Sequence, residues 1–384
     1  MALSMRWFCV SAGVVVSLIL TQGASGGDLE LVYRGKASIE MSATDQNGQA
    51  FDVSGLSGIT WAGGNTYWAV MDNSDKLVKL SVDVNADGSI ASAVVAGGLT
   101  VSASRDYEGI AFTNAQRNSV WLSDEASSEM GVREFSLDDG SLMSAAPMPT
   151  VYADVRGNFG LESVTMTPDR QTMWTANEEA LSVDGSLSST TAGSVVRLQR
   201  FDMVNNVPAA GTQYAYVTDP VHTATNDDPT QPGSVSRSGL SDLVALPDGR
   251  LLALERSFAR AGNYDLGSQY RNSIFLLDLE AASDVSSMSA LESGEFTPVG
   301  KTDLWSITQG ILDGAQIIGN LEGLALGPRL ENNNYLLLGI VDSGGSSDPL
   351  SDNRLVAFEL VGVPEPATAV LLLAGMMTLM RRRP

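Results

Sequence analysis

Cysteine is almost absent from this 384-residue chain. The single cysteine, Cys9, lies in residues 1–26, where Arg6 is followed by an apolar run and then by small residues. This order is typical of a secretory signal peptide, which is removed from the mature protein. Removal of Cys9 with residues 1–26 would exclude disulfide bonds, thiolate metal ligands and a cysteine nucleophile.

Basic residues are also scarce. The chain has 23 lysines and arginines against 45 aspartates and glutamates, and its formal charge is −22. A surface that binds nucleic acid needs a basic stripe along the phosphates, so we expect no nucleic-acid partner. The acidity fits a soluble extracellular protein or a protein that binds cations.

Histidine occurs once, at His222 in a polar segment. Zinc is therefore disfavoured as a bound metal, and a Ser-His-Asp triad would have to use His222, for which the sequence identifies no serine partner. Residues 28–362 contain no G-x-S-x-G motif and no Gly-rich phosphate loop that ends in Gly-Lys-Ser/Thr. Carboxylates are then the obvious candidates for a catalytic base.

The longest apolar run near the C-terminus, residues 367–380, has 14 residues. A membrane-spanning helix needs about 20, and the three arginines at 381–383 carry the charge expected on the cytoplasmic side. Pro364-Glu365-Pro366 precedes the run, and this order makes residues 363–384 similar to a PEP-CTERM sorting signal. The resemblance implies a short hydrophobic helix in transient membrane contact, an exosortase-type processing enzyme as partner, and export to the surface of a Gram-negative bacterium. An ordinary C-terminal anchor is the alternative.

Helical periodicity is lacking between the two termini, and a short motif recurs there instead. In the motif, Ser or Glu interrupts the start of an apolar run: "GLSGITW" (55–61), "DYEGIAF" (106–112), "GLESVTM" (160–166), "GLSDLVA" (239–245) and "NLEGLAL" (320–326). Each motif predicts a first strand. A second strand follows at 66–72, 119–125, 171–179, 249–256 and 334–342, and a third at 76–83, 131–138, 194–202, 272–280 and 353–360.

A weaker fourth strand follows four of the five repeats, at 91–100, 149–155, 212–218 and 296–304. The fifth repeat has none, so we expect the strand at 29–41 to pair with 353–360 and close the last blade. Four-stranded units repeated around an axis make a β-propeller. We predict an all-β fold, a five-bladed β-propeller over residues 28–362. The long connections at 203–237 and 281–318 exceed ordinary loop lengths, so they are either insertions over one face or a sixth blade.

The polar residues of the repeats are predicted to meet at one end of the central channel. In an antiparallel blade the start of the first strand and the end of the second lie at the same edge. Clustered carboxylates need raised pKa values or a cation, and oxygen ligands favour Ca²⁺. The predicted ligands are Glu108, Glu162, Glu322, Asp72, Glu178, Glu255 and Asp342. The alternative is structural, with these groups bonded to the next blade or facing solvent.

The units "GLSGITW…YWAVMDNS", "DYEGIAF…VWLSDE" and "NLEGLAL…LLGIVDS" resemble the phytase-like family described as having esterase-like activity. The resemblance implies a secreted β-propeller with Ca²⁺-assisted hydrolysis of phosphate esters. As predicted catalytic residues we take Glu108, Glu162 and Glu322, with Arg105 and Arg256 meeting an anionic substrate. Salt bridges to nearby carboxylates are the alternative for both arginines.

Two classes of function follow from this sequence. One is a Ca²⁺-dependent hydrolase of small-molecule phosphate esters or simple esters, with a lactonase-like propeller as a variant. The other is a non-catalytic module that binds extracellular matrix or exopolysaccharide. The sequence does not separate these two classes.

Overall fold

The computed structural model describes residues 29–126, 129–231, 233–310, 318–342 and 353–364. The predicted signal peptide (1–26) lies outside these residues, as does nearly all of the predicted sorting signal (363–384). Among the described residues no helix is long and apolar enough to cross a membrane.

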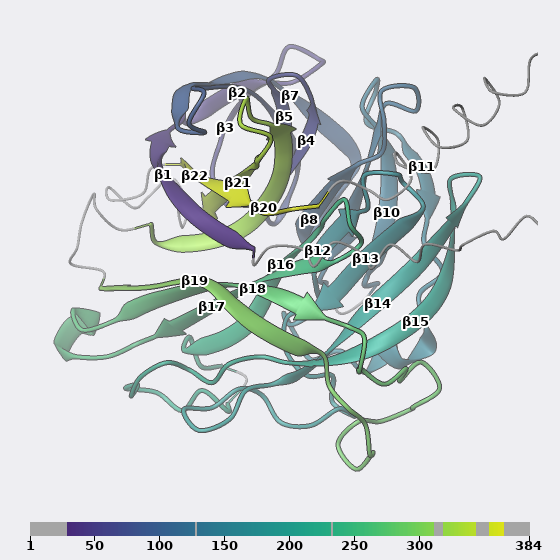
Figure 1. Ribbon diagram of the computed structural model, residues 1–384, viewed down its shortest axis with the longest axis vertical. Coiled ribbons are helices and arrows are strands. Elements are labelled where there is room, and N and C mark those ends of the chain that lie inside the picture. Colours follow the sequence, from purple (N-terminus) through teal and green to yellow (C-terminus); the bar gives the residue numbers. More distant parts are fainter. Residues whose placement is uncertain (1–28, 127–128, 232, 311–317, 343–352, 365–384) are drawn as a thin grey trace, which may run out of the picture.

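The described chain forms five four-stranded antiparallel sheets and one small hairpin (Figure 1). Within each sheet the strands follow one another in sequence from the channel outward, except where the N-terminal strand joins the last sheet. The first blade consists of β4 (Leu56–Gly63), β5 (Thr66–Met71), β6 (Ser74–Val84) and β7 (Ile90–Arg105). The second blade consists of β8 (Tyr107–Phe112), β9 (Ser119–Asp124), β10 (Gly131–Ser136) and β11 (Leu142–Ala145).

The third and fourth blades are built in the same order. The third blade consists of β12 (Leu161–Met166), β13 (Thr172–Asn177), β14 (Val195–Val204) and β15 (Val207–Val217). The fourth blade consists of β16 (Arg237–Ala245), β17 (Leu251–Ala259), β18 (Gln269–Asp278) and β19 (Gly300–Gly310). The fifth blade is β20 (Asn320–Arg329), β21 (Tyr335–Asp342), β22 (Arg354–Val361) and β1 (Glu30–Ser38). The molecule is a five-bladed β-propeller, as predicted.

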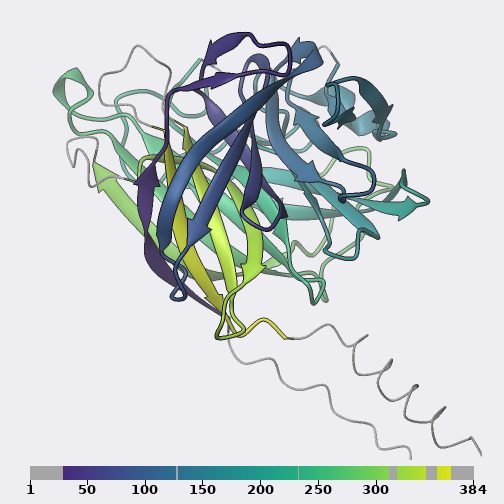
Figure 2. The ribbon, with the colours of Figure 1, turned by 90° about the horizontal axis from the view of Figure 1, so that it is seen from above.

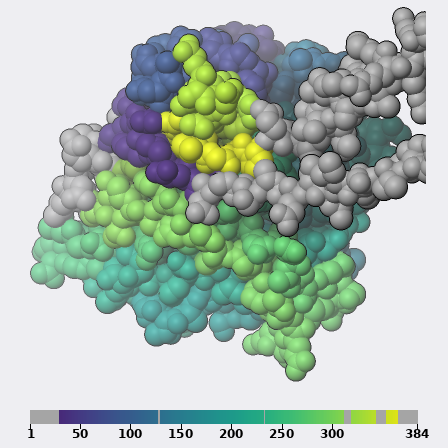
Figure 3. Space-filling model, viewed as in Figure 1, coloured from purple at the N-terminus to yellow at the C-terminus, as the bar shows by residue number. Residues whose placement is uncertain are grey.

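The N-terminal strand β1 completes the fifth blade. It pairs antiparallel with β22, from Glu30 opposite Val361 to Ser38 opposite Arg354. Figures 2 and 3 show the purple β1 beside the yellow β22, although the two are far apart in sequence. The predicted closure is therefore confirmed. It is followed by a hairpin that the sequence did not predict, β2 (Ser42–Thr44) and β3 (Ala50–Asp52).

The alternative of a sixth blade is wrong. The segment 203–237 supplies the turn and outer strand of the β14–β15 hairpin, and 281–318 supplies β19. The fourth strand expected at 149–155 is also wrong: residues Thr150–Asp154 form a 3₁₀ turn, and the outer strand is β11. Pro147 and Pro149 explain this difference, because proline has no N–H to donate to a sheet.

The core consists of apolar clusters that lie between adjacent blades. Each of the five large clusters draws its buried residues from two neighbouring sheets, and the fifth and first blades share one as well. Trp121, between the second and third blades, and Phe358, between the fourth and fifth, are examples. Burial of each such side chain contributes roughly 1.5–3 kcal/mol, so blade-to-blade packing holds the ring together.

The innermost strands β4, β8, β12, β16 and β20 also contact one another around the axis. Glycine permits the closest approaches. A Cβ atom on Gly58 would lie 2.5 Å from the carbonyl oxygen of Glu108, and one on Gly323 would lie 2.5 Å from that of Ser57. The glycine that follows the polar residue in three of the five motifs, Gly58, Gly109 and Gly323, is therefore required by the narrow waist of the channel.

Candidate functional site

A β-bulge recurs at the start of all five innermost strands. The register shifts directly after Leu56, Tyr107, Leu161, Leu240 and Leu321, which are the residues that precede the Ser or Glu of the motif. A bulge turns a side chain away from the regular alternation of a strand. The bulge accounts for a buried polar group at this point of an apolar strand, because it lies at the edge of the sheet, beside the channel.

These bulges and the ends of the second strands surround a cavity of about 910 Å³ at one end of the channel. Six of the seven predicted metal ligands line it: Glu108, Glu162, Glu322, Asp72, Glu178 and Asp342. Glu108, Glu162 and Glu322 are each less than a tenth exposed. The structure therefore brings together carboxylates that are up to 270 residues apart in sequence.

Glu255 is the predicted ligand that the structure places elsewhere. Register explains the difference: Glu255 pairs with Leu240, whereas the cavity residue Asp342 pairs with Asn320, one position earlier in the motif. Arg256 takes the equivalent position in the fourth blade. The carboxylate of Glu255 instead accepts hydrogen bonds from the Tyr216 hydroxyl, the Asp219 amide and Lys301 Nζ.

Arg256 lines the acidic cavity and pairs with two of its carboxylates. Its guanidinium donates to Glu178 Oε1 at 2.8 Å and to Glu322 Oε1 at 2.7 Å, which joins the third, fourth and fifth blades. Asn320 Nδ2 also donates to Glu322 Oε1, at 2.6 Å. Two of the cavity carboxylates are thus held by Arg256, as the salt-bridge alternative expected.

Arg105, the other predicted substrate contact, does not line the cavity. Its guanidinium is bound to the buried carboxylate of Asp124 and, at 2.8 Å, to Glu129. Arg133 Nη1 also forms an ion pair with Asp124 Oδ2, at 2.6 Å. Asp124 lies one position before the cavity residue Glu125, just as Glu255 lies one position before Arg256. Arg105 therefore belongs to an ion-pair network on the flank of the second blade.

Six carboxylates at this end of the channel form two groups. In each group the carboxylate oxygens lie within 4.8 Å of one another: Asp72, Asp106 and Glu108 in one, Glu125, Glu162 and Glu178 in the other, which Arg256 touches only through Glu178. Ser57 Oγ donates to Glu108 Oε2. Such crowding of like charges is unfavourable without protons or a cation.

The pKa values of these groups are raised. Burial, and then the charges of Glu178 and Asp106, raise the pKa of Glu125 to about 9. Burial and Asp72 raise the pKa of Asp106 to about 7. The pKa values of Glu108 and Glu162 also lie well above their ordinary range, chiefly because both side chains are buried.

Glu322 differs from these groups because a cation touches it. Burial raises its pKa to about 7, while Arg256 opposes the shift and Asp342 adds to it. A carboxylate whose pKa lies near neutrality is able to accept and release a proton at working pH. Asp106 has the same pKa of about 7, but of the two only Glu322 lines the cavity, so Glu322 is the carboxylate suited to proton transfer there.

Sequence reasoning missed several residues at this cavity. Glu125 and Asp106 complete the two carboxylate groups, and Arg156, Phe159 and Arg237 line the rim. Arg237 stacks on the Phe159 ring at 4.5 Å and donates to the carbonyl oxygens of 229, 231 and 234. Glu125 occupies the repeat position of Asp72 and Glu178, so strict alignment of the second strands would have found it.

The donor set fits a hard divalent cation. Glu125 Oε2 and Asp106 Oδ1 are buried, and among the described residues neither atom has a hydrogen-bond partner. Both belong to the carboxylate groups, so the orphaned atoms lie where a cation would bind. Every donor in both groups is a carboxylate oxygen, the ligand type that Ca²⁺ takes in sets of six to eight.

The fold and the site together define a class, a five-bladed β-propeller with an acidic channel mouth. Residues 52–342 match the sequence model of the family described as "Phytase-like: Esterase-like activity of phytase". The match spans more than half of the chain, and the chain belongs to this family. No curated protein matches it.

Solved structures with a similar course of the chain share little sequence. A periplasmic gluconolactonase from Pseudomonas aeruginosa is 13% identical, with 88% of this chain and 98% of that chain covered and a TM-score of 0.34. A mannose phosphorylase from Leishmania mexicana, in complex with phosphate ion, is 11% identical, with 88% and 91% covered and a TM-score of 0.37. A luciferin-regenerating enzyme is 10% identical, with 81% and 93% covered and a TM-score of 0.37.

Proposed function

We propose that the acidic cavity is the active site of a Ca²⁺-dependent hydrolase that acts on phosphate esters or simple esters. The observation that carries this proposal is the pair of carboxylate groups, each within 4.8 Å, beside Arg256 in a cavity of about 910 Å³. Asp72, Asp106 and Glu108, and Glu125, Glu162 and Glu178, would hold the metal. Bound Ca²⁺ would polarise the ester and offset negative charge in the transition state.

The residues of the chain supply the other parts of the reaction. Arg256 holds Glu178 and Glu322 in place through hydrogen bonds of 2.8 and 2.7 Å. Glu322 would accept the proton of an attacking water, because its pKa of about 7 suits a general base. Arg156, which lines the cavity, is partly exposed and donates to the Ala180 and Ser182 carbonyls, so it presents positive charge to an incoming anion.

The family description supports hydrolysis of an ester. The experiment has to decide whether the substrate is a phosphate ester or a carboxylic ester. The direct test measures release of p-nitrophenol from p-nitrophenyl phosphate and from p-nitrophenyl acetate, with Ca²⁺ and with EDTA. We expect turnover of at least one ester in Ca²⁺, loss of turnover in EDTA, and a loss of about 10²-fold or more in Glu322→Gln. Turnover that is unchanged by EDTA would overturn the metal-dependent mechanism.

Metal binding is tested separately from activity. Calorimetric titration of the EDTA-stripped protein should show Ca²⁺ binding, and the free energy of unfolding should rise by about 2.7 kcal/mol at one hundred times Kd. Glu162→Gln should remove this rise, whereas Glu255→Gln, a buried glutamate outside the cavity, should keep it. Absence of binding heat at millimolar Ca²⁺ would favour the non-catalytic matrix-binding module.

Export and surface sorting are part of the same proposal. The support is the order of segments in residues 1–26 and 363–384. Mass spectrometry of the native protein should find chains that begin after residue 26 and end near Pro364-Glu365-Pro366. Surface material that retains Arg381 to Arg383 would contradict processing by an exosortase-type enzyme.

A further inference from the structure

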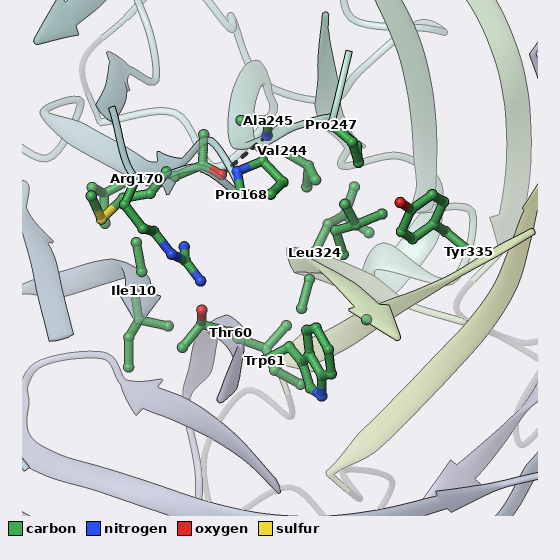
Figure 4. A pocket seen from close by; sticks show the side chains of 18 of the residues that line it. Thr60, Trp61, Ile110, Pro168, Arg170, Val244, Ala245, Pro247, Leu324 and Tyr335 are labelled. Atoms are coloured by element: carbon green, nitrogen blue, oxygen red, sulfur yellow. Dashed lines mark hydrogen bonds between the residues drawn. The ribbon is translucent and has the colours of Figure 1, made fainter. Parts of the chain in front are cut away.

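The opposite end of the channel holds a second cavity, of about 380 Å³ (Figure 4). Its wall is built from the far halves of the same five innermost strands whose near ends carry the carboxylates. The wall is mostly apolar, and its side chains include Ile110, Val164, Val244, Leu324 and Trp61. A volume in this range, with apolar walls and few polar groups, is typical of small-molecule sites.

The two cavities are separate sites. They share no lining residue. Between them lies the waist, where Gly58 and Gly109 let neighbouring strands approach until a Cβ atom would lie 2.5 Å from backbone atoms. Carboxylates line the first cavity, whereas none lines the second. A ligand of the second cavity would therefore not be repelled by acidic neighbours in its own wall.

Arg170 gives this apolar cavity a positive charge. It lies in the turn between β12 and β13 with a φ of 60°, and Figure 4 shows its guanidinium pointing into the cavity. Among the described residues no hydrogen bond or ion pair reaches that guanidinium. The neighbouring Asp169 instead accepts hydrogen bonds from Thr167 Oγ1 and the Gln171 amide.

The matching turn of the next blade shows the ordinary arrangement. There Arg250 Nε donates to Asp248 Oδ2 at 2.8 Å, so the charge of Arg250 is neutralised by a carboxylate of the same turn. Arg170 has no such hydrogen bond; burial lowers its pKa from the ordinary value, and the nearby charge of Asp169 opposes this shift only in part. A half-buried charge without a partner costs solvation energy, and an anion would repay that cost.

A hydroxyl lies on the same side of the cavity. Thr60 Oγ1 accepts a hydrogen bond from the Phe112 amide at 3.0 Å, which leaves the hydroxyl proton free to donate. A second cation, Arg329, stacks on the Tyr335 ring at 4.9 Å in the same wall. The Thr60 hydroxyl and the Arg170 guanidinium thus both offer hydrogen-bond donors to a ligand.

We propose that this cavity binds a small amphiphilic carboxylate, with the carboxylate on Arg170 and Thr60 and the alkyl chain along the apolar strand ends. The charge selects an anion, and the apolar wall selects a ligand with a hydrocarbon body. A polyanion such as inositol polyphosphate would leave most of its charges unpaired here. This site is independent of the proposed hydrolase activity at the other mouth.

The test is a titration of the full chain with decanoate in EDTA and about 0.15 M salt, which screens the net negative charge of the protein. Binding is followed by calorimetry and by tryptophan fluorescence. We expect Arg170→Gln to weaken decanoate binding by about tenfold or more, because a charge-assisted hydrogen bond is lost. Arg170→Lys should retain most of the affinity, and the matched control Arg250→Gln should retain all of it.

Decylamine is the charge-reversed probe, with the same chain length. It should bind at least about tenfold more weakly than decanoate. Equal binding would show that the cavity binds alkyl chains without regard to charge, and would overturn the proposal. The Trp61→Phe variant locates the ligand without altering Arg170. If decanoate changes the fluorescence of wild type and Trp61→Phe equally, or if wild type binds no decanoate at millimolar concentration, the proposal is wrong.

Discussion

Arg256 donates a 2.7 Å hydrogen bond to Glu322 across the boundary between the fourth and fifth blades. Glu322 belongs to the first strand of its blade, and Arg256 occupies a position that holds an acid in the other four blades: Asp72, Glu125, Glu178 and Asp342. This one exchange of charge makes the ring of five blades asymmetric. It places a cation beside the carboxylate whose pKa is about 7, and most of the other acids belong to the two groups that we propose as the Ca²⁺ site.

Replacement of this cation should have opposite effects on stability and on metal binding. In Arg256→Gln, two buried carboxylates lose their partner, so the metal-free protein should lose about 3 kcal/mol of unfolding free energy. The site also becomes more negative, so Ca²⁺ should bind about tenfold more tightly or better. Urea unfolding in EDTA and calorimetric titration measure the two effects.

Arg105→Gln is the matched control for that experiment. Arg105 also pairs with a buried carboxylate, Asp124, but lies outside the cavity, and Arg133 stays on Asp124 at 2.6 Å. We expect a smaller loss, about 1–2 kcal/mol, and no change in Ca²⁺ affinity. Equal effects of the two variants on Ca²⁺ affinity would contradict the placement of the metal site.

The metal-free protein should lose stability as pH rises. The folded pKa is about 7 for Asp106 and Glu322 and about 9 for Glu125, whereas unfolded carboxyls titrate near 4. The folded state therefore holds these protons between pH 4 and 9, and by linkage the stability that these three groups contribute is greatest below pH 4 and is lost as pH rises through their folded pKa values.

Melting curves in EDTA from pH 5 to pH 9 test this trend. Replacement of Glu125 by Gln should flatten the upper part of the decline, because that side chain no longer titrates. Saturating Ca²⁺ should raise the melting temperature most at high pH, where the carboxylates are ionised. A wild-type melting temperature that climbs steadily across this range in EDTA would show that these carboxylates are not the controlling groups.

Much of the fold could be read from the sequence, because its determinants are local and repeated. The five motifs predicted five innermost strands, and the missing last strand of the fifth repeat predicted the β1–β22 pair. The outer strands were placed less well. They face solvent on one side and carry weak patterns, so Leu142–Ala145 was missed in favour of a proline-bounded turn at Thr150–Asp154.

The site was predicted in type and partly in detail. Six of the seven predicted ligands line the cavity, because the repeat places the first-strand polar group correctly. Glu255 was misplaced by one position: strand residues alternate between two faces, so a shift of one residue moves a side chain to the other face. The repeats did not predict Arg170 as a site residue, because it lies in a turn and the cavity around it is formed largely by strands of the other blades.

Closure by β1 should be essential for a stable ring. Deletion of residues 29–41 would leave the backbone of β22 without its partner and remove Leu31, which is 7% exposed, from the core between the fourth and fifth blades. We expect aggregation or loss of the cooperative unfolding transition, measured by circular dichroism and light scattering. A matched deletion of residues 1–28 should leave the transition intact, and equal behaviour of the two truncations would rule out this role.

The narrow waist of the channel should depend on glycine in β8. A Cβ atom at Gly109 would lie 2.5 Å from the Val164 amide nitrogen and 2.7 Å from Ser123 Oγ, and the strands behind these atoms are fixed in their own sheets. We therefore expect Gly109→Ala to lower the free energy of unfolding by about 3 kcal/mol. It should also weaken Ca²⁺ binding, because the added methyl group displaces the adjacent Glu108 from its carboxylate group.

The control for this prediction is Gly131→Ala in β10. A Cβ atom there would meet only the flexible Arg133 side chain, at 3.7 Å, so the substitution should be neutral or stabilise by about 0.5 kcal/mol. Urea unfolding and Ca²⁺ titration of both variants give the comparison. If Gly109→Ala is as stable as Gly131→Ala, the innermost strands have room to separate, and the waist does not fix the carboxylates at the channel mouth.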